Sequence, residues 1–244
     1  MKQWTSGINK SSLSFDAYEK MAEYYFECVD TKPFNAYYER PATLSVLPPV
    51  QGKTVLDAGC AAGWYSNWLL EHGASVTAVD FSPNMIAMAK RRVGEKAEVR
   101  RADLHEPLSF LADNSMDIVV SSLALHYLKT WEVVLAEFNR ILKPSGHLVF
   151  SIHHPFRDFS AFPGGNYFTT EMVEDKWETN RGTVKVQFYR RSLSVIIAAI
   201  LDAGLIIEKL LEPTPTAQFA EVHPAEYEEL TKKPHFLIIR ARKN

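Results

Sequence analysis

One short segment of the chain has the composition of a backbone cradle for a ligand. Residues 57–63 read DAGCAAG and lead directly into a stretch with helical periodicity. Gly59 and Gly63 allow the backbone to approach a ligand with no Cβ in the way. Because loops of this kind serve several ligands, the spacing of the neighbouring residues has to decide between them.

Three common interpretations of the loop fail on spacing. A phosphate-binding loop needs a second glycine five places after its first glycine, followed directly by lysine. Five places after Gly59 this chain has Trp64, and no lysine follows it. The dinucleotide fingerprint Gly-x-Gly-x-x-Gly, laid from Gly59, meets Ala61 and then Trp64. Tryptophan at that last position disfavours a nicotinamide-dependent oxidoreductase. The chain has no Gly-x-Ser-x-Gly sequence, which excludes the commonest serine hydrolase on an α/β sheet.

Three acidic residues are placed around the loop. Asp57 precedes Gly59, Asp80 follows it by 21 residues at the end of a predicted strand, and Asp103 ends the next strand. A carboxylate at Asp80 would accept hydrogen bonds from both ribose hydroxyls. Each acid alone could equally be a helix cap or a surface carboxylate. Together they would repel a pyrophosphate and attract a cationic nucleoside.

Strands that alternate with helices must position these residues. Apolar and β-branched runs predict a first strand that begins at Val55 and six further strands, at 75–80, 97–103, 116–122, 147–153, 205–211 and 236–242. Helical segments are predicted at 63–72, 84–92, 131–142 and 192–203. This order predicts an α/β fold with a Rossmann-like, doubly wound, seven-stranded sheet, mostly parallel with an antiparallel edge strand. Ligands bind such sheets beyond the carboxyl ends of the strands.

Two aromatic-rich segments lie outside the alternation. We expect residues 1–50 to form an N-terminal helical cap on a domain that spans 51–244, and residues 155–191 to form an insertion after the fifth strand. Val184, Val186 and Phe188 alternate with polar residues, which indicates a strand or hairpin in the insertion. Most of the aromatic side chains would belong to small satellite cores, but as sets they predict a lid over a pocket.

The composition predicts a soluble, cytoplasmic protein. The 244 residues are 46% hydrophobic and 23% charged, as in globular proteins. A net charge of -2 gives no basic field for nucleic acid, and two cysteines suit a reducing compartment. Residues 1–4 lack the apolar core of a signal peptide, and the longest apolar run, 195–201, is too short for a membrane helix. No His/Cys cluster has metal-ligand spacing, so we expect no metal, no nucleic acid and no membrane partner.

Five segments in order resemble the motifs of class I S-adenosylmethionine-dependent methyltransferases, specifically the small-molecule type related to the ubiquinone-biosynthesis methyltransferases. They are residues 55–63 (VLDAGCAAG), 76–82 (VTAVDFS), 102–104 (ADL), 117–122 (DIVVSS) and 142–148 (LKPSGHL). The chain departs from the family at position 61, where alanine replaces the usual glycine. The resemblance implies S-adenosylmethionine as cofactor and in-line methyl transfer to an O, N or C nucleophile of a small, partly apolar acceptor.

The resemblance also implies how the methionine part of the cofactor would be held. Asp57 would lie near its amino group, and the backbone at Gly59, Ala61 and Gly63 would surround it. Ser121, at the end of the fourth strand, would touch the methionyl end.

The next motifs would hold the adenosine half. Asp80 would bind the ribose diol, Phe81 and Met85 would flank the adenine, and Asp103 with the backbone of Leu104 would bind its amino edge. Met85 could instead be a core residue of its helix.

The sequence NAYYERP at residues 35–41 resembles a branch of the family in which N-terminal helices close over the cofactor. Tyr25, Tyr38 or Arg40 would then contact the cofactor carboxylate, for which arginine is the natural partner. A surface salt bridge is the alternative for Arg40.

Two histidines are candidates for a general base, which would accelerate transfer to a hydroxyl or amine by roughly 10²–10⁴-fold. His126 follows the fourth strand and His154 the fifth; we favour His126, although a lone histidine is more often structural. The fourth strand continues as SSLA and not as the Asn/Asp-Pro-Pro-aromatic turn of relatives that methylate nucleic acids, which favours a small-molecule acceptor. A catalytically silent regulatory module that binds S-adenosylmethionine is the alternative function.

Overall fold

The computed structural model describes residues 13–179 and 182–244. The expectation that residues 1–4 are no signal peptide, and the first part of the predicted cap, lie outside the described residues. Within the described ranges, no helix combines the length and the apolar character needed to cross a membrane.

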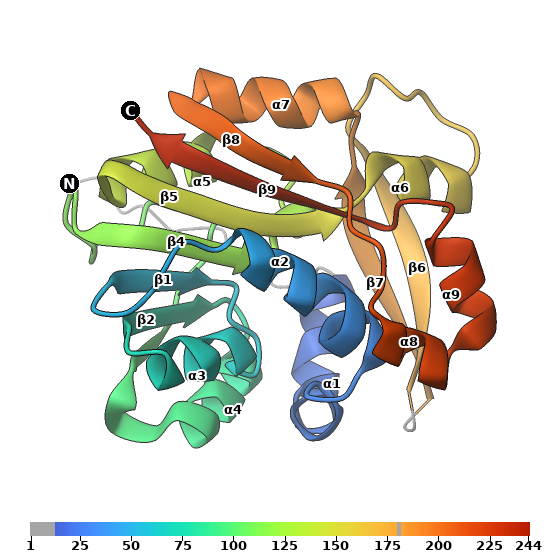
Figure 1. Ribbon diagram of the computed structural model, residues 1–244, viewed down its shortest axis with the longest axis horizontal. Helices are drawn as coiled ribbons and strands as arrows, with labels where there is room; N and C mark the ends of the chain where they lie inside the picture. Colours follow the sequence, from blue (N-terminus) through green and yellow to red (C-terminus); the bar gives the residue numbers. More distant parts are fainter. Residues whose placement is uncertain (1–12, 180–181) are drawn as a thin grey trace, which may run out of the picture.

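A seven-stranded sheet forms the centre of the molecule (Figure 1), with the strand order β3-β2-β1-β4-β5-β9-β8. Strands β1 to β5 pair in parallel, whereas β9 runs antiparallel to both of its neighbours. The predicted Rossmann-like α/β fold is therefore confirmed. The antiparallel strand β9 is next to the edge of the sheet, and β8 is the edge strand.

The bounds of the elements define the layers. The main sheet consists of β1 (Thr54–Ala58), β2 (Ser75–Asp80), β3 (Glu98–Arg101), β4 (Met116–Ser122), β5 (Leu142–His153), β8 (Leu205–Leu211) and β9 (Phe236–Lys243). The helices between its strands are α3 (Trp64–Glu71), α4 (Pro83–Val93), α5 (Glu132–Ile141) and α7 (Leu193–Asp202). The other elements are α1 (Leu13–Cys28), a π-helix (Asn35–Glu39), α2 (Arg40–Val46), α6 (Pro155–Ala161), the hairpin strands β6 (Glu171–Thr179) and β7 (Gly182–Arg190), α8 (Ala217–Val222) and α9 (Pro224–Leu230).

Both faces of the sheet are covered, and β4 shows why. Its apolar run places Val119 in the core with α5 and α7, and Ile118 and Val120 in the core with α3 and α4. All three side chains are at most 2% exposed. This arrangement agrees with the continuous apolar pattern that parallel, doubly covered strands require.

Two strands and two helices differ from the sequence expectation. Strand β5 begins at Leu142, five residues earlier than predicted, because Leu142 pairs with Met116 before the register shifts ahead of Ile118. Strand β3 is shorter than predicted and ends at Arg101. Helices α8 and α9 between β8 and β9 were not predicted, whereas the hairpin in the insertion is confirmed.

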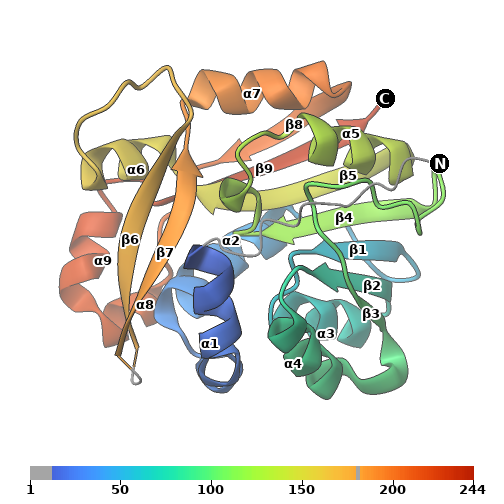
Figure 2. The same cartoon turned by 180° about the vertical axis from the view of Figure 1, so that it is seen from behind.

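Helix α1 lies between α4 and the hairpin strand β7, as Figure 2 shows from behind. The Ser14 hydroxyl donates to the carbonyl of Gln187 and accepts from the backbone N–H of the same residue at 2.8 Å. On the other side, Glu23 of α1 pairs with Arg91 of α4 at 3.1 Å. These contacts connect α1 to the sheet domain and to the insertion at once, above the carboxyl ends of the strands.

Candidate active site

The loop after β1 is built from left-handed backbone. Gly59, Ala61 and Gly63 have φ angles of 83°, 46° and 77°. A Cβ on Gly59 would lie 2.5 Å from the Cβ of Ala124, so that position requires glycine on both conformational and steric grounds. Ala61 adopts the left-handed region without that freedom, a type of backbone strain that collects at functional sites.

Asp80 connects this loop to the start of α4. Its carboxylate accepts the backbone N–H of Ala61 and that of Ser82, each at 2.9 Å. Burial raises the pKa of Asp80, and these backbone hydrogen bonds offset part of the shift. The carboxylate therefore lies at the loop, beside the place where the predicted ribose would bind.

Asp57 lies beneath the loop and is 1% exposed. Its carboxylate accepts a 2.5 Å hydrogen bond from the hydroxyl of Ser66 on α3. Burial raises its pKa to about 7, the Ser66 hydrogen bond opposes the rise, and nearby Asp80 adds to it. The charge of Asp57 therefore changes near neutral pH.

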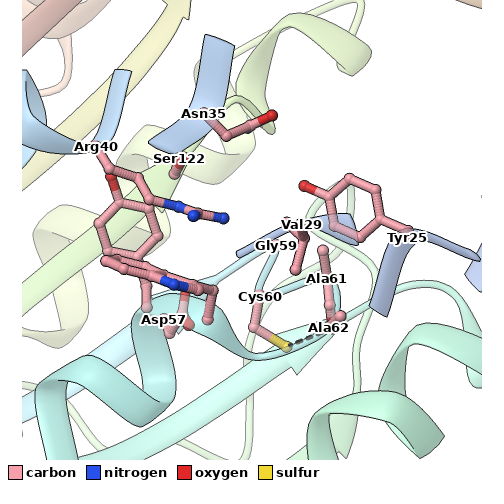
Figure 3. A pocket seen from close by; sticks show the side chains of 12 residues that line it. Tyr25, Val29, Asn35, Arg40, Asp57, Gly59, Cys60, Ala61, Ala62 and Ser122 are labelled. Carbon is pink, nitrogen blue, oxygen red and sulfur yellow. Dashed lines mark hydrogen bonds between the residues drawn. The ribbon is translucent and has the colours of Figure 1, made fainter. Parts of the chain in front are cut away.

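A pocket opens between this loop and the N-terminal helices (Figure 3). The loop and strand side contributes Asp57, Gly59, Cys60, Ala61, Ala62, Trp64, Tyr65 and Ser122, and the N-terminal side contributes Tyr25, Val29, Asn35 and Arg40. The pocket thus brings together five of the predicted site residues: Asp57, Gly59, Ala61, Tyr25 and Arg40.

Arg40 extends its guanidinium into the pocket (Figure 3). The side chain is 4% exposed, stacks over the ring of Trp64 at 4.0 Å and donates to the backbone carbonyl of Asp30 at 3.3 Å. Burial lowers its pKa, as expected for a cation removed from water. Its partners are an aromatic face and a carbonyl, so it keeps capacity for an anionic ligand and is not the surface salt bridge that the sequence left open.

Glu39 was not predicted as a site residue. It is fully buried, and its Oε1 accepts hydroxyls of Thr43 at 2.9 Å, Ser122 at 2.9 Å and Ser151 at 2.5 Å. The Tyr65 hydroxyl donates to the same carboxylate at 3.1 Å. Glu39 thereby joins the π-helix to the ends of β4 and β5 and to α3, and two of its partners line the pocket. An acid directly after two tyrosines in the helical sequence NAYYERPA was the available signal.

Two of the predicted adenine residues, Phe81 and Met85, pack against α1 and do not line this pocket. The ring of Phe81 packs edge-on against Phe15 of α1 at 5.0 Å. Met85 is 1% exposed and packs with residues of α1, which agrees with its interpretation as core. Asp103 accepts from the ring and the backbone of His105 at 2.8 and 2.9 Å. Burial raises the pKa of Asp103, but the His105 contacts outweigh it and lower the pKa overall.

Other predicted residues do not line the pocket. Tyr38 points away from it, because its hydroxyl donates to the Pro213 carbonyl at 3.0 Å and its ring packs against Phe236. The Ser121 hydroxyl is buried and donates to the carbonyl of Ala58 at 2.8 Å. Gly63 caps the start of α3 with its left-handed backbone, and Leu104 packs against the main core.

The two candidate bases have different surroundings. His154 caps α6, because its Nδ1 accepts the Phe156 N–H at 3.0 Å, and its Nε2 lies 2.7 Å from Glu212. The neighbouring His153 is the one that turns toward His126, with their rings stacked at 4.2 Å. Burial, with the charges of Arg191 and Arg157, lowers the pKa of His126 to about 3. An imidazole this weakly basic is a poor proton acceptor at neutral pH.

Known proteins share both the motif region and the whole fold. Residues 56–150 match the family model "Methyltransferase domain". The Bacillus subtilis protein named putative methyltransferase YqeM is 30% identical over 173 residues, which are 68% of each chain. A crystal structure described as an S-adenosylmethionine-dependent methyltransferase from Mesorhizobium loti is 30% identical with a TM-score of 0.70, covering 88% of this chain and all of that one. Phosphoethanolamine N-methyltransferase 1 of Triticum aestivum is 35% identical over 115 residues, which are 45% of this chain and 23% of the wheat protein.

Proposed function

Because this chain belongs to the S-adenosylmethionine-dependent methyltransferases, we propose that the pocket between the loop after β1 and the N-terminal helices holds the methionine end of the donor. The observation that carries the proposal is the pairing of Arg40 and Asp57 in one pocket. A free amino acid end has one carboxylate and one ammonium. Arg40, from the N-terminal side of the pocket, is a cation, and Asp57, from the strand side, is a carboxyl group whose pKa is about 7.

The chemistry of the remaining side chains fits the donor. Asp80, at the loop, keeps lone pairs beyond its two backbone hydrogen bonds and would accept from a ribose diol. Gly59, Ala61 and Ala62 line the pocket with small or no side chains, so a ligand can approach the loop backbone. The buried carboxylates of Asp57 and Glu39, together with the half-buried Asp80, favour a ligand with positive charge.

The role of the protein is to hold the donor and the acceptor and to orient them for methyl transfer. S-adenosylmethionine, when bound, supplies a methyl group on a sulfonium, and the electrons of the broken carbon–sulfur bond remain on the sulfur. The protein has to keep the acceptor nucleophile in line with that bond, and positioning of this kind contributes ~7–11 kcal/mol in favourable cases. His126 is neutral at physiological pH, so in this proposal it positions the acceptor by hydrogen bonding. The proton of a hydroxyl or amine acceptor is released to solvent.

We propose that the acceptor is a small, partly apolar molecule. The aromatic residues of the insertion and Tyr127 beside His126 support an apolar part of the acceptor. The name of the wheat relative, Phosphoethanolamine N-methyltransferase 1, supports only its small size. The continuation of β4 as SSLA and the net charge of -2 argue against a nucleic acid substrate. A relation to ubiquinone biosynthesis remains a hypothesis from the motifs alone.

The test of the proposed binding mode compares two matched arginines. Arg40 stacks over Trp64 at 4.0 Å inside the pocket, and Arg100 stacks over Phe110 at 3.9 Å on the surface. We expect Arg40→Met to weaken S-adenosylhomocysteine binding at least tenfold in calorimetry and Arg100→Met to leave it within twofold. Equal affinities for Arg40→Met and the wild type, with both folded by thermal unfolding, would remove Arg40 from the site.

A further inference from the structure

A second buried polar cluster lies beyond the ends of β4 and β5, next to the hairpin. His126 is 3% exposed and stacks on His153 with ring centroids 4.2 Å apart and planes within 18°. Both rings meet Phe188 of β7 edge-on, at 5.7 and 4.8 Å. The cluster is thus enclosed by the fourth and fifth strand ends and by the insertion.

Several nitrogens of this cluster have no hydrogen-bond partner. Both ring nitrogens of His126 are buried with no hydrogen-bond partner. The Nδ1 of His153 also makes no hydrogen bond and lies 3.7 Å from the Asp158 carboxylate. Arg191, which follows β7, is 5% exposed; its Nη2 donates to the Leu128 carbonyl at 2.5 Å, but its Nη1 is also unpartnered. Buried polar atoms are normally satisfied by protein, water or a ligand, so a group of four in one region calls for an explanation.

The charges around the cluster indicate that an anion would complete it. Arg191 stacks on Trp131 at 4.3 Å and bonds to backbone carbonyls, while Asp158 and Glu132 act on it only at longer range. Of these two acids, Asp158 is engaged by Arg157 at 2.9 Å, and Glu132 is exposed in the first turn of α5. A buried guanidinium without a carboxylate partner is costly unless a ligand supplies the anion.

We propose that His126, His153 and Arg191 form the acceptor subsite and that the acceptor carries a carboxylate. This inference rests on the proposed function. Arg191 supplies one formal positive charge and each neutral imidazole supplies one N–H, so the site matches the single charge of a carboxylate better than the double charge of a phosphate. The second nitrogen of His126 remains as an acceptor for the hydroxyl or amine of the same molecule.

The position of the cluster fits transfer from the donor pocket. Tyr127 follows His126 in the chain, and its hydroxyl shares a 2.8 Å hydrogen bond with that of Tyr18 on α1. The Tyr18 ring packs against Tyr25, which lines the donor pocket, at 6.4 Å. Tyr127, Tyr18 and Tyr25 therefore form a chain of contacts from the cluster to the lining of the donor pocket.

The experiment uses benzoate and its neutral counterpart benzamide as probes of the full-length protein saturated with S-adenosylhomocysteine. We expect benzoate to shift the ring NMR signals of His126 and His153 in a saturable way, and benzamide to bind at least tenfold more weakly. Arg191→Met should reduce benzoate affinity at least tenfold and leave S-adenosylhomocysteine affinity within twofold, whereas Arg100→Met should change neither.

A second variant protects the test against a folding defect of Arg191→Met. His126→Phe keeps the aromatic stack on His153 and removes the two unpartnered nitrogens, and we expect the same loss of benzoate affinity. Equal binding of benzoate and benzamide, or benzoate binding that survives both variants while S-adenosylhomocysteine still binds, would overturn the carboxylate subsite alone. Failure of the wild type to bind S-adenosylhomocysteine would instead overturn the proposed function on which the subsite rests.

Discussion

Removing the Glu39 carboxylate should destabilise the protein more than any surface change. Four hydroxyls, from Thr43, Tyr65, Ser122 and Ser151, donate to this fully buried side chain. A hydrogen bond to a charged group contributes about 1.5–3 kcal/mol, and a buried donor left unpaired costs about 1–3 kcal/mol. Because rotating hydroxyls can find some new partners, we expect Glu39→Ala to lower the free energy of unfolding by about 3–5 kcal/mol.

The assay is urea unfolding of Glu39→Ala, Glu39→Gln and a matched surface variant. Glu39→Gln keeps one carbonyl oxygen as acceptor, so we expect a loss of only about 1–2 kcal/mol. Glu71 is exposed and accepts one bond from Asn67, so Glu71→Ala should stay within about 0.5 kcal/mol. At about 2–4 °C per kcal/mol, Glu39→Ala should lower the Tm by roughly 10 °C. A loss below about 1 kcal/mol would refute the idea that this carboxylate holds the π-helix to the strand ends.

Three further predictions concern the loop and the histidine cluster. Because burial raises the pKa of Asp57 to about 7, its negative charge appears as the pH rises through neutrality. In calorimetry, the affinity for S-adenosylhomocysteine should therefore increase between about pH 6 and 8. Asp57→Asn should flatten this increase, and a flat profile for the wild type would contradict the assignment. Ala61→Gly should raise the free energy of unfolding by roughly 0.5–1 kcal/mol, because it relieves a left-handed φ of 46°; a destabilised variant would argue against strain there. Burial lowers the pKa of His126 from 6.5 to about 3, so below pH 6.5 the folded state binds fewer protons than the unfolded state. The free energy of unfolding, measured in urea, should therefore fall as the pH drops toward 3. His126→Phe should show a smaller fall over the same pH range.

The sequence was sufficient where local pattern decides the structure. The apolar run at Ile118–Val120 is typical of a strand that is covered on both faces, as the structure shows. Ser82 before Pro83 is typical of a helix start, and in the structure the Ser82 hydroxyl accepts the Met85 N–H at 3.0 Å at the start of α4. The loop at residues 57–63 and Asp80 were found by the same local reasoning, since strand ends and small residues are visible in a single chain.

Long-range contacts decided the rest. The donors to Glu39 lie up to 112 residues away in the chain, so no local pattern reveals that its carboxylate gathers them. The direction of Tyr38 depends on Pro213, 175 residues away, and the inward turn of His153 in place of His154 depends on the cap of α6. The segment 143–146 looks like a helix stop followed by a loop, yet pairing of Leu142 with Met116 extends β5 through it.

The central claim is that the carboxyl ends of β1 and β2 bind the adenosine donor through Asp80. The most direct measurement is calorimetric titration of the wild type and Asp80→Asn with S-adenosylhomocysteine, with Asp113→Asn, whose side chain is 70% exposed, as the matched control. We predict saturable binding to the wild type and the control, and at least tenfold weaker binding to Asp80→Asn, which corresponds to about 1.4 kcal/mol. Equal affinity of all three proteins, or no binding to the wild type, would contradict the claim.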